Sequence, residues 1–96
     1  MSFSVVASFE VLPEAIAKFE TALKKLTETT RLEPGCDAYI VHRNSEKPGS
    51  YFIIESYKFY EEYLIHRESE HVALFRATAS DSFAQPPLIL RGEPAW

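Results

Sequence analysis

The pattern of hydrophobic and polar residues changes from alternation to helical spacing near the start of the chain. Between Phe3 and Val11 every second residue is apolar, and most residues between them are polar, which predicts a strand. Pro13 then opens a predicted helix, because proline is tolerated in a first helical turn. This helix should end near Glu33, since Pro34-Gly35 cannot continue it. Its apolar stripe consists of Ala15, Ile16, Phe19, Ala22, Leu23 and Leu26.

Two further strands follow the first helix. We expect strands over Cys36–Arg43 and Tyr51–Tyr57, joined by a turn over Asn44–Gly49. The last of these strands begins with four apolar residues, so both of its faces should be covered. One layer of helices covers only one face, and the other needs a second layer, most simply a second copy of the chain.

The second helical region is predicted as two helices with a break between them. The first covers Lys58–Arg67, and Ser69 can cap a second that runs to about Ala79. We expect Phe59, Tyr63 and either Ile65 or His66 to face the core in the first, and Val72, Leu74 and Phe75 in the second.

A short last strand completes the predicted order of elements. A loop over Ser80–Pro87 leads to a strand over Leu88–Leu90, and Arg91 to Trp96 forms a tail. The order β-α-β-β-α-β predicts an α+β fold of the ferredoxin-like type with an antiparallel sheet.

Composition narrows the function classes. A length of 96 residues fits one domain, and the single cysteine, Cys36, excludes an intrachain disulfide and favours a cytoplasmic protein. With a net charge of −4 and scattered Lys and Arg, we expect no nucleic-acid partner. No apolar run approaches the roughly 18 residues of a membrane span, so we expect no membrane partner either. Cys36 itself is interpreted as a small packing residue.

Two histidines and one glutamate are the candidates for chemistry. His66 and His71 would diverge by about 140° on one continuous helix, and they converge only if the helix breaks near Glu68-Ser69. A histidine suits proton abstraction near neutral pH, although a helix-end histidine can also simply satisfy backbone carbonyls.

Glu55 is placed at a strand end, near solvent. It could act as a base, orient His66 or pair with an arginine, and the ion pair is the favoured interpretation. No metal is expected, because the chain has no HExxH motif and two histidines five residues apart are a poor chelate. The three glycines form no nucleotide-binding motif.

Short motifs in a fixed order make the chain similar to the antibiotic biosynthesis monooxygenase domain family. The resemblance covers about residues 2–93, and residues 94–96 form a tail. The motifs are Phe19 and Leu23, then Glu33-Pro34-Gly35-Cys36 and Tyr39, then Phe52, Ile54, Glu55 and Tyr57, and finally His66-Arg67-Glu68-Ser69-Glu70-His71-Val72 with Phe75. The resemblance implies a homodimeric α+β barrel. Members of the family include cofactor-independent monooxygenases of quinols and polyketide phenols, an isomerase of a phosphorylated diketone and haem-degrading enzymes.

The resemblance implies three alternative functions. In a cofactor-independent oxygenase of a small aromatic substrate, His66 would be the base, and His71 or Glu55 would orient it. The pocket would be lined by Tyr39, Tyr63 and Phe75. An isomerase or tautomerase of a small dicarbonyl would use the same base, and a phosphorylated substrate would need Arg67 or Arg76. A non-catalytic dimeric binding module is the third. The haem branch is disfavoured, because the first strand lacks the asparagine of that branch and Trp96 is the only tryptophan.

Overall fold

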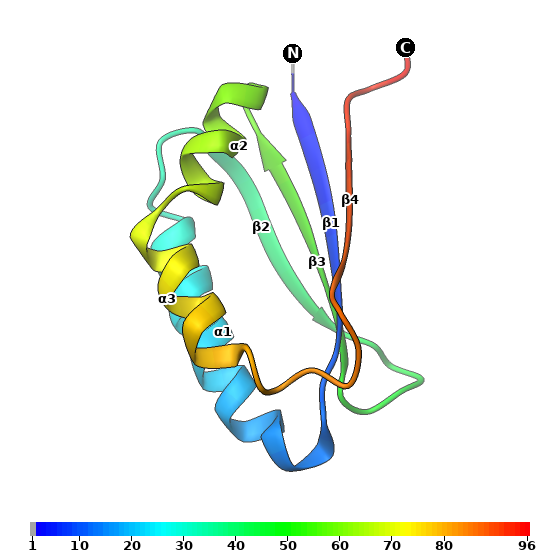
Figure 1. Ribbon diagram of the computed structural model, residues 1–96. Coiled ribbons are helices and arrows are strands. Elements are labelled where there is room, and N and C mark those ends of the chain that lie inside the picture. The colour runs from blue at the N-terminus through cyan, green and yellow to red at the C-terminus, as the bar shows by residue number, and fades with distance from the viewer. Residues whose placement is uncertain (1) are drawn as a thin grey trace.

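The computed structural model describes residues 2–96 and shows helices packed on one face of an antiparallel sheet (Figure 1). The four strands stand in the order β2-β3-β1-β4, as the α+β ferredoxin-like prediction requires. The elements are β1 (Phe3–Glu10), the 3-10 turn η1 (Pro13–Ala15), α1 (Ile16–Thr30), β2 (Cys36–Arg43), β3 (Ser50–Tyr57), α2 (Tyr60–Arg67), α3 (Glu70–Ala79) and β4 (Leu88–Gly92).

The register of the sheet brings residues from all four strands into one row beneath the helices. Glu55 is opposite Val5 on β1 and opposite Tyr39 on β2, and Val5 is also opposite Arg91 on β4. Side chains of directly paired strand residues lie on the same face of a sheet. The row Tyr39–Glu55–Val5–Arg91 therefore crosses the helix-facing side of the sheet. Arg91 takes part in it because β4 ends at Gly92, two residues beyond the predicted end at Leu90.

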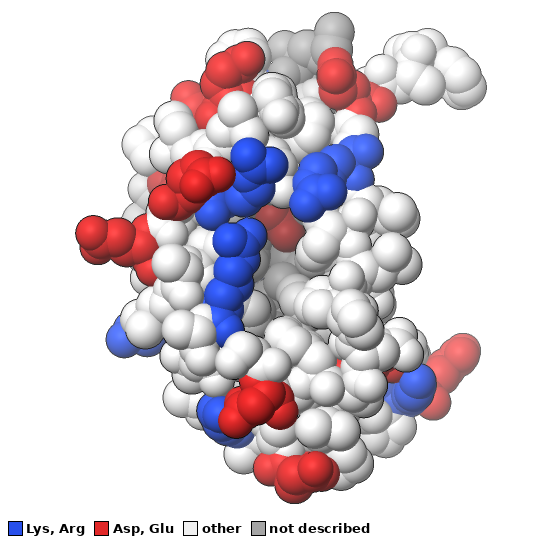
Figure 2. All heavy atoms as spheres, in the orientation of Figure 1, with Lys and Arg blue, Asp and Glu red and all other residues white. Residues whose placement is uncertain are grey.

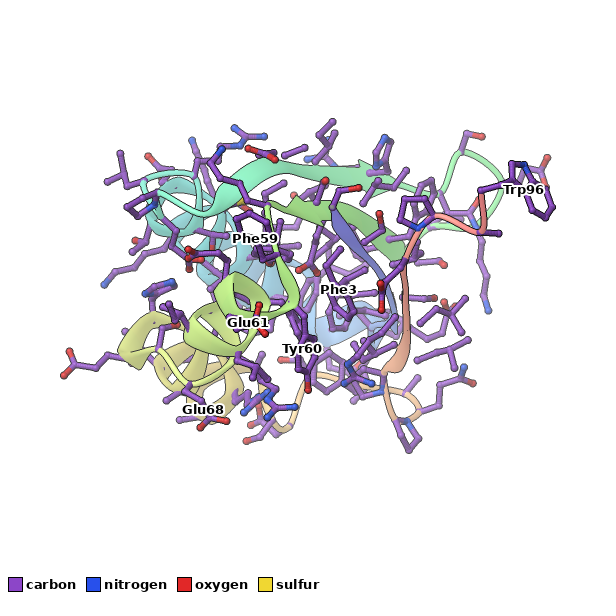
Figure 3. All side chains as sticks on the ribbon, turned by 90° about the horizontal axis from the view of Figure 1, so that it is seen from above. Phe3, Phe59, Tyr60, Glu61, Glu68 and Trp96 are labelled. Carbon is purple, nitrogen blue, oxygen red and sulfur yellow. The ribbon has the colours of Figure 1, made fainter. Side chains whose placement is uncertain are left out.

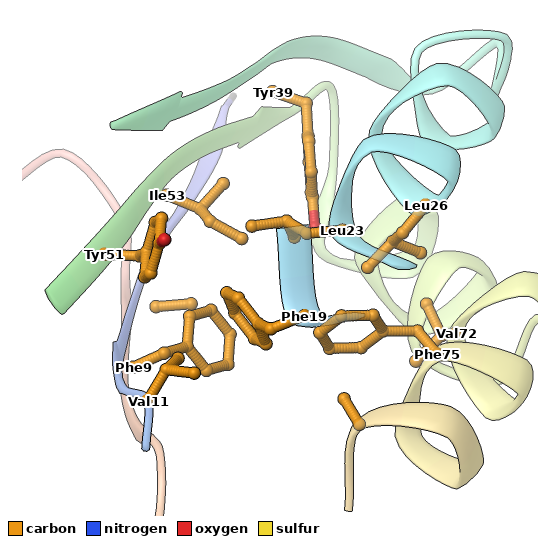
Figure 4. Packing of buried hydrophobic residues seen from close by; sticks show 12 residues of the cluster. Phe9, Val11, Phe19, Leu23, Leu26, Tyr39, Tyr51, Ile53, Val72 and Phe75 are labelled. Atoms are coloured by element: carbon orange, nitrogen blue, oxygen red, sulfur yellow. The ribbon is translucent and has the colours of Figure 1, made fainter. Parts of the chain in front are cut away.

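An aromatic cluster holds the helices on the sheet (Figure 4). Phe19 of α1 is fully buried, and its ring centroid lies 5.0 Å from that of Tyr51 and 5.6 Å from that of Phe9. Phe75 of α3 closes the cluster at 5.9 Å from Phe19. The Phe19–Phe75 pair is edge-to-face and the other two are tilted, and aromatic pairs at such distances stabilise beyond the area they bury, by about 0.5–1.5 kcal/mol per pair.

The ends of two helices differ from the predicted ends for local reasons. α1 ends at Thr30 rather than near Glu33, because Glu33 N–H bonds to the carbonyl of Thr30 in a tight i to i+3 turn. α2 begins at Tyr60 rather than Lys58, because Lys58 N–H donates to the carbonyl of Gly35 and Phe59 is extended. The first change leaves the Glu33 side chain outside the helix.

Two apolar residues predicted to face the core lie on the surface instead, since Phe59 is 53% exposed and Leu74 is 52% exposed. Of the alternatives Ile65 and His66, His66 is the buried one and Ile65 is 62% exposed. α2 is only eight residues long, and its buried positions, Tyr63 and His66, are three residues apart. In the view from above, Phe59 and Tyr60 stand at the start of α2, and the ring of Tyr60 packs on Phe3 at 5.1 Å (Figure 3).

The face of the sheet away from the helices carries an exposed apolar row. Ile54 is paired with Ile40 on β2 and with Val6 on β1, which is paired with Leu90 on β4. All four side chains are exposed in the single chain. The apolar run at the start of β3 thus lies on both faces of the sheet, and the cover that we expect over this second face stays a prediction. In the part of the chain that the structure describes, no helix has the length and apolar character needed to cross a membrane.

Candidate active site

The break between α2 and α3 brings the two histidines together. Ser69 caps α3, because its Oγ accepts a hydrogen bond from Val72 N–H at 3.3 Å, and it also donates to the carbonyl of His66 at 2.7 Å. The helix direction changes at this cap, and the rings of His66 and His71 come within 6.0 Å. The prediction that the two histidines converge only where the helix breaks near Glu68-Ser69 is confirmed.

Glu33 holds both histidines through one carboxylate oxygen. Its Oε2 lies 2.8 Å from Nδ1 of His66 and also hydrogen-bonds Nε2 of His71. An ionised carboxylate only accepts, so Nδ1 of His66 donates, and Nε2 of a neutral ring keeps its lone pair. Burial lowers the pKa of His66, against the opposing effect of Glu33. The neutral ring with an unprotonated Nε2 is thus favoured near pH 7.

Glu55 is buried, and the prediction that it lies near solvent is wrong. Its exposed fraction is 5%, because it shares the helix-facing side of β3 with Ile53. Tyr57 donates a hydrogen bond to Oε1 of Glu55 at 2.6 Å, and Nε2 of His66 lies 3.9 Å from the same atom. Burial raises the pKa of Glu55 to about 7, although Tyr57 and Arg91 oppose this shift. Within residues 2–96 no arginine forms an ion pair with Glu55, so the pairing that we favoured is not formed, and the basic group beside Glu55 is the neutral ring of His66.

A cavity of about 410 Å³ opens between the sheet and the α2–α3 layer. Five of the six predicted site residues line it, namely Tyr39, Glu55, Tyr63, His66 and Phe75. The sixth, His71, lies on the other side of Glu33, where it lines a groove between α1 and α3. The walls are mainly apolar and aromatic, with few polar groups, as is typical of small-molecule sites.

Three residues of the site escaped the analysis of the sequence. Glu33 was placed at a helix end, Tyr57 at a strand end and Arg91 in the tail, and none of them was given a role in the site. Glu33 reaches the histidines across more than thirty residues of chain, and no periodic pattern encodes such a contact. The available signals were two motifs of the family resemblance, Glu33-Pro34-Gly35-Cys36 and the strand that contains Tyr57.

The carboxylate of Glu33 and the two histidines that it contacts also form a donor set for a metal ion. Glu33, His66 and His71 each place one ligand atom within 4.8 Å of the others. Two imidazole nitrogens and a carboxylate oxygen suit zinc or iron. In this structure both nitrogens are at hydrogen-bonding distance from one oxygen, which is the arrangement of a triad that shares protons.

Comparison with known proteins gives a consistent result. A sequence profile described as "Antibiotic biosynthesis monooxygenase" matches residues 2–78. The fold is similar to a putative antibiotic biosynthesis monooxygenase from Nitrosomonas europaea, with a TM-score of 0.93 at 20% identity, covering 99% of this chain and 91% of that one. A conserved protein from Methanosarcina mazei Go1 gives a TM-score of 0.91 at 27% identity, over 96% and 91% of the two chains. A search of curated proteins found no match.

Proposed function

The chain belongs to the antibiotic biosynthesis monooxygenase family, and we propose that it is a cofactor-independent monooxygenase of a small quinol or phenol with His66 as the base. One observation carries the proposal. The Glu33 carboxylate engages Nδ1 of His66 and leaves Nε2 beside an aromatic-lined cavity. Among the described residues Nε2 makes no hydrogen bond, and Oε1 of Glu55 lies 3.9 Å away.

The first step is a proton transfer from the substrate hydroxyl. A phenol whose ring lies among Tyr39, Tyr63 and Phe75 can direct its hydroxyl at Nε2 of His66, which takes the proton. The imidazolium that forms is stabilised by Glu33 through a charge-assisted hydrogen bond. Substrate deprotonation is thereby favoured without a metal or an organic cofactor.

Oxygen then reacts with the electron-rich anion. One electron passes from the quinolate to O₂, the resulting radical pair forms a C–O bond, and a proton from the site gives a hydroperoxide. Loss of the ring proton and cleavage of the O–O bond release water and leave a carbonyl. A quinol and O₂ thus give a hydroxyquinone and water, and the substrate supplies all the electrons. Glu55, with a pKa of about 7, can exchange the proton that this elimination requires.

Oxygen uptake with 1,4-naphthohydroquinone tests the proposal. We expect consumption above the rate of autoxidation, a loss of about 100-fold or more in His66→Ala, and little change in His42→Ala. His42 is a matched control because it stacks on Phe52 instead of lining the cavity. Equal rates for the wild-type protein and His66→Ala across a panel of quinols and phenols would contradict the proposal.

An isomerase remains the second candidate, for one specific reason. A base, His66, and a carboxyl group with a pKa near 7, Glu55, lie on one cavity, and enolisation of a dicarbonyl needs such a pair. The isomerase reaction needs no oxygen. Turnover of a 1,3-dicarbonyl under anaerobic conditions, lost in His66→Ala, would favour it, whereas ligand binding without turnover of either substrate class would favour a binding module.

We also propose that the protein is a homodimer joined through the open face of the sheet. The exposed row Ile40–Ile54–Val6–Leu90 crosses all four strands. Burial of apolar surface stabilises by about 25 cal/mol per Å². A second copy of the chain would cover this row with an identical row and close the barrel.

A further inference from the structure

Three arginines surround the cavity that holds the proposed base. Arg67 at the end of α2, Arg76 on α3 and Arg91 on β4 all contribute to its lining. Figure 2 shows basic side chains gathered around a hollow on this face of the molecule. The chain has ten Lys and Arg and a net charge of −4, so three cations at one cavity do not follow from overall composition.

These arginines are only weakly committed to carboxylates of the protein. Arg91 donates through Nε to the hydroxyl of Tyr63 at 2.8 Å, which leaves its terminal NH₂ groups available. Arg67 contacts the exposed Glu68 at 3.3 Å, a surface pair of small energy. Within residues 2–96, Arg76 makes no side-chain hydrogen bond and no ion pair. Glu55 is the one carboxyl group among the described residues that line the cavity, so three guanidinium groups there face a single carboxyl group.

Two of the arginines act directly on the reactive groups. Arg91 lowers the pKa of Glu55, against the effect of burial. Arg76 lowers the pKa of His66, in the same direction as burial. Arg67 and Arg91 also lie 6.0 and 5.8 Å from the centre of the Tyr63 ring. Arg67 and Arg91 thus flank Tyr63 on one side of the cavity, and Arg76 lines the same cavity from α3.

We infer that the substrate is an aromatic compound with an anionic substituent, a carboxylate or a phosphate. Arg67, Arg76 and Arg91 would bind the anion at the entrance, while the ring occupies the apolar part of the cavity and directs its hydroxyl at His66. A volume of about 410 Å³ is sufficient for one or two rings. The orientation toward His66 rests on the proposed function, whereas the preference for an anion does not.

Calorimetric titration with matched probes tests this inference. The first pair is 2,5-dihydroxybenzoate and its uncharged methyl ester, and the second is phenyl phosphate and inorganic phosphate. We expect at least one aromatic anion to bind ten-fold or more tightly than the methyl ester, with an affinity that falls as salt is added. The two anions separate carboxylate from phosphate as the preferred group.

Variants identify the responsible side chains. Arg76→Gln should lower the affinity for the anion several-fold, and Arg76→Gln with Arg91→Gln should abolish the preference over the ester. Lys24→Gln removes the same charge from an exposed position that lines a different hollow, and it should retain the preference. Arg76 is exposed and makes no side-chain hydrogen bond within the described chain, so the single variant should keep the fold and isolate the charge.

Several results would overturn the inference. Equal affinity for the ester and both aromatic anions would remove the role of charge, and so would a wild-type protein that binds neither anion below about millimolar concentration. Inorganic phosphate bound as tightly as phenyl phosphate would remove the role of the ring. The titration measures binding and does not depend on oxygen uptake. A protein that binds the anions but consumes no oxygen would therefore contradict the monooxygenase proposal and leave the anion preference intact.

Discussion

At the scale of single residues, His66 is distinguished by which of its nitrogens is occupied. Nδ1 is bound to Glu33, and Nε2 lies 3.9 Å from the buried Glu55. A carboxylate behind an imidazole fixes the tautomer and stabilises the cation that forms when the ring accepts a proton. Glu33 is thus a positioning residue that acts through His66 without contacting the substrate.

Glu33→Gln should reduce turnover while leaving the cavity intact. The loss of a charge-assisted hydrogen bond, worth about 1.5–3 kcal/mol, corresponds to a decrease in kcat of roughly 10- to 100-fold with little change in KM. Glu33 raises the pKa of His66, so in the variant the acid limb of the pH–rate profile should move to lower pH. A purely structural role would not move this limb. Glu70→Gln, an exposed change on the same helix pair, is the control.

Glu55 makes stability depend on pH in a defined direction. Its pKa is about 7 in the folded protein and near 4.5 in the unfolded chain, so the folded state retains a proton that the unfolded state has released. Its stabilising contribution is complete below pH 4.5 and is lost as the pH rises through 7. The loss amounts to roughly 3 kcal/mol.

Glu55→Gln should remove this dependence, because the amide can still accept the hydrogen bond from Tyr57 but carries no charge at any pH. In urea unfolding at constant protein concentration, the variant should gain stability relative to the wild-type protein between pH 5 and 8.5. Glu28→Gln, on the exposed side of α1, should show a constant difference. A constant difference for Glu55→Gln as well would mean that the carboxylate is already ionised in the folded protein at pH 5.

At the scale of elements, the break between α2 and α3 determines the site. α2 ends at Arg67, Ser69 caps the start of α3, and the change of direction between them brings two histidines five residues apart into contact through Glu33. The break was predictable because capping is local chemistry, written in a few adjacent residues. The end of α1 was harder to predict, since a tight turn after Thr30 moves Glu33 out of the helix.

Ser69→Ala should destabilise the protein by about 1 kcal/mol, since a helix cap is lost together with a hydrogen bond to the carbonyl of His66. The contact of His71 with Glu33 should loosen, and imidazole NMR signals of both histidines should shift. Ser80→Ala at the other end of α3 is the control, because its exposed hydroxyl bonds only the carbonyl of Ala77. An equal effect of the two changes on stability and on the histidine signals would contradict a special role for the break.

At the scale of the whole molecule, the sheet register unites residues that no local pattern connects. Strand and helix positions follow from periodicity, which explains why the β-α-β-β-α-β order could be predicted. The row Tyr39–Glu55–Val5–Arg91 depends on which strands pair and in what register, so the burial of Glu55 and the place of Arg91 became visible only in the fold. The same register aligns Ile54 with apolar neighbours on the opposite face.

Ile54→Glu should separate the proposed dimer into monomers. The side chain lies in the centre of the exposed row, between Ile40 and Val6, so a symmetric partner would bury two unpaired carboxylates at several kcal/mol each. Sedimentation velocity should give a dimer for the wild-type protein and a monomer for the variant. Ile65→Glu adds the same charge at an exposed apolar position of α2 and should remain dimeric. A monomeric wild-type protein would show that this face is not closed by a second copy, and a dimeric Ile54→Glu would place the interface elsewhere.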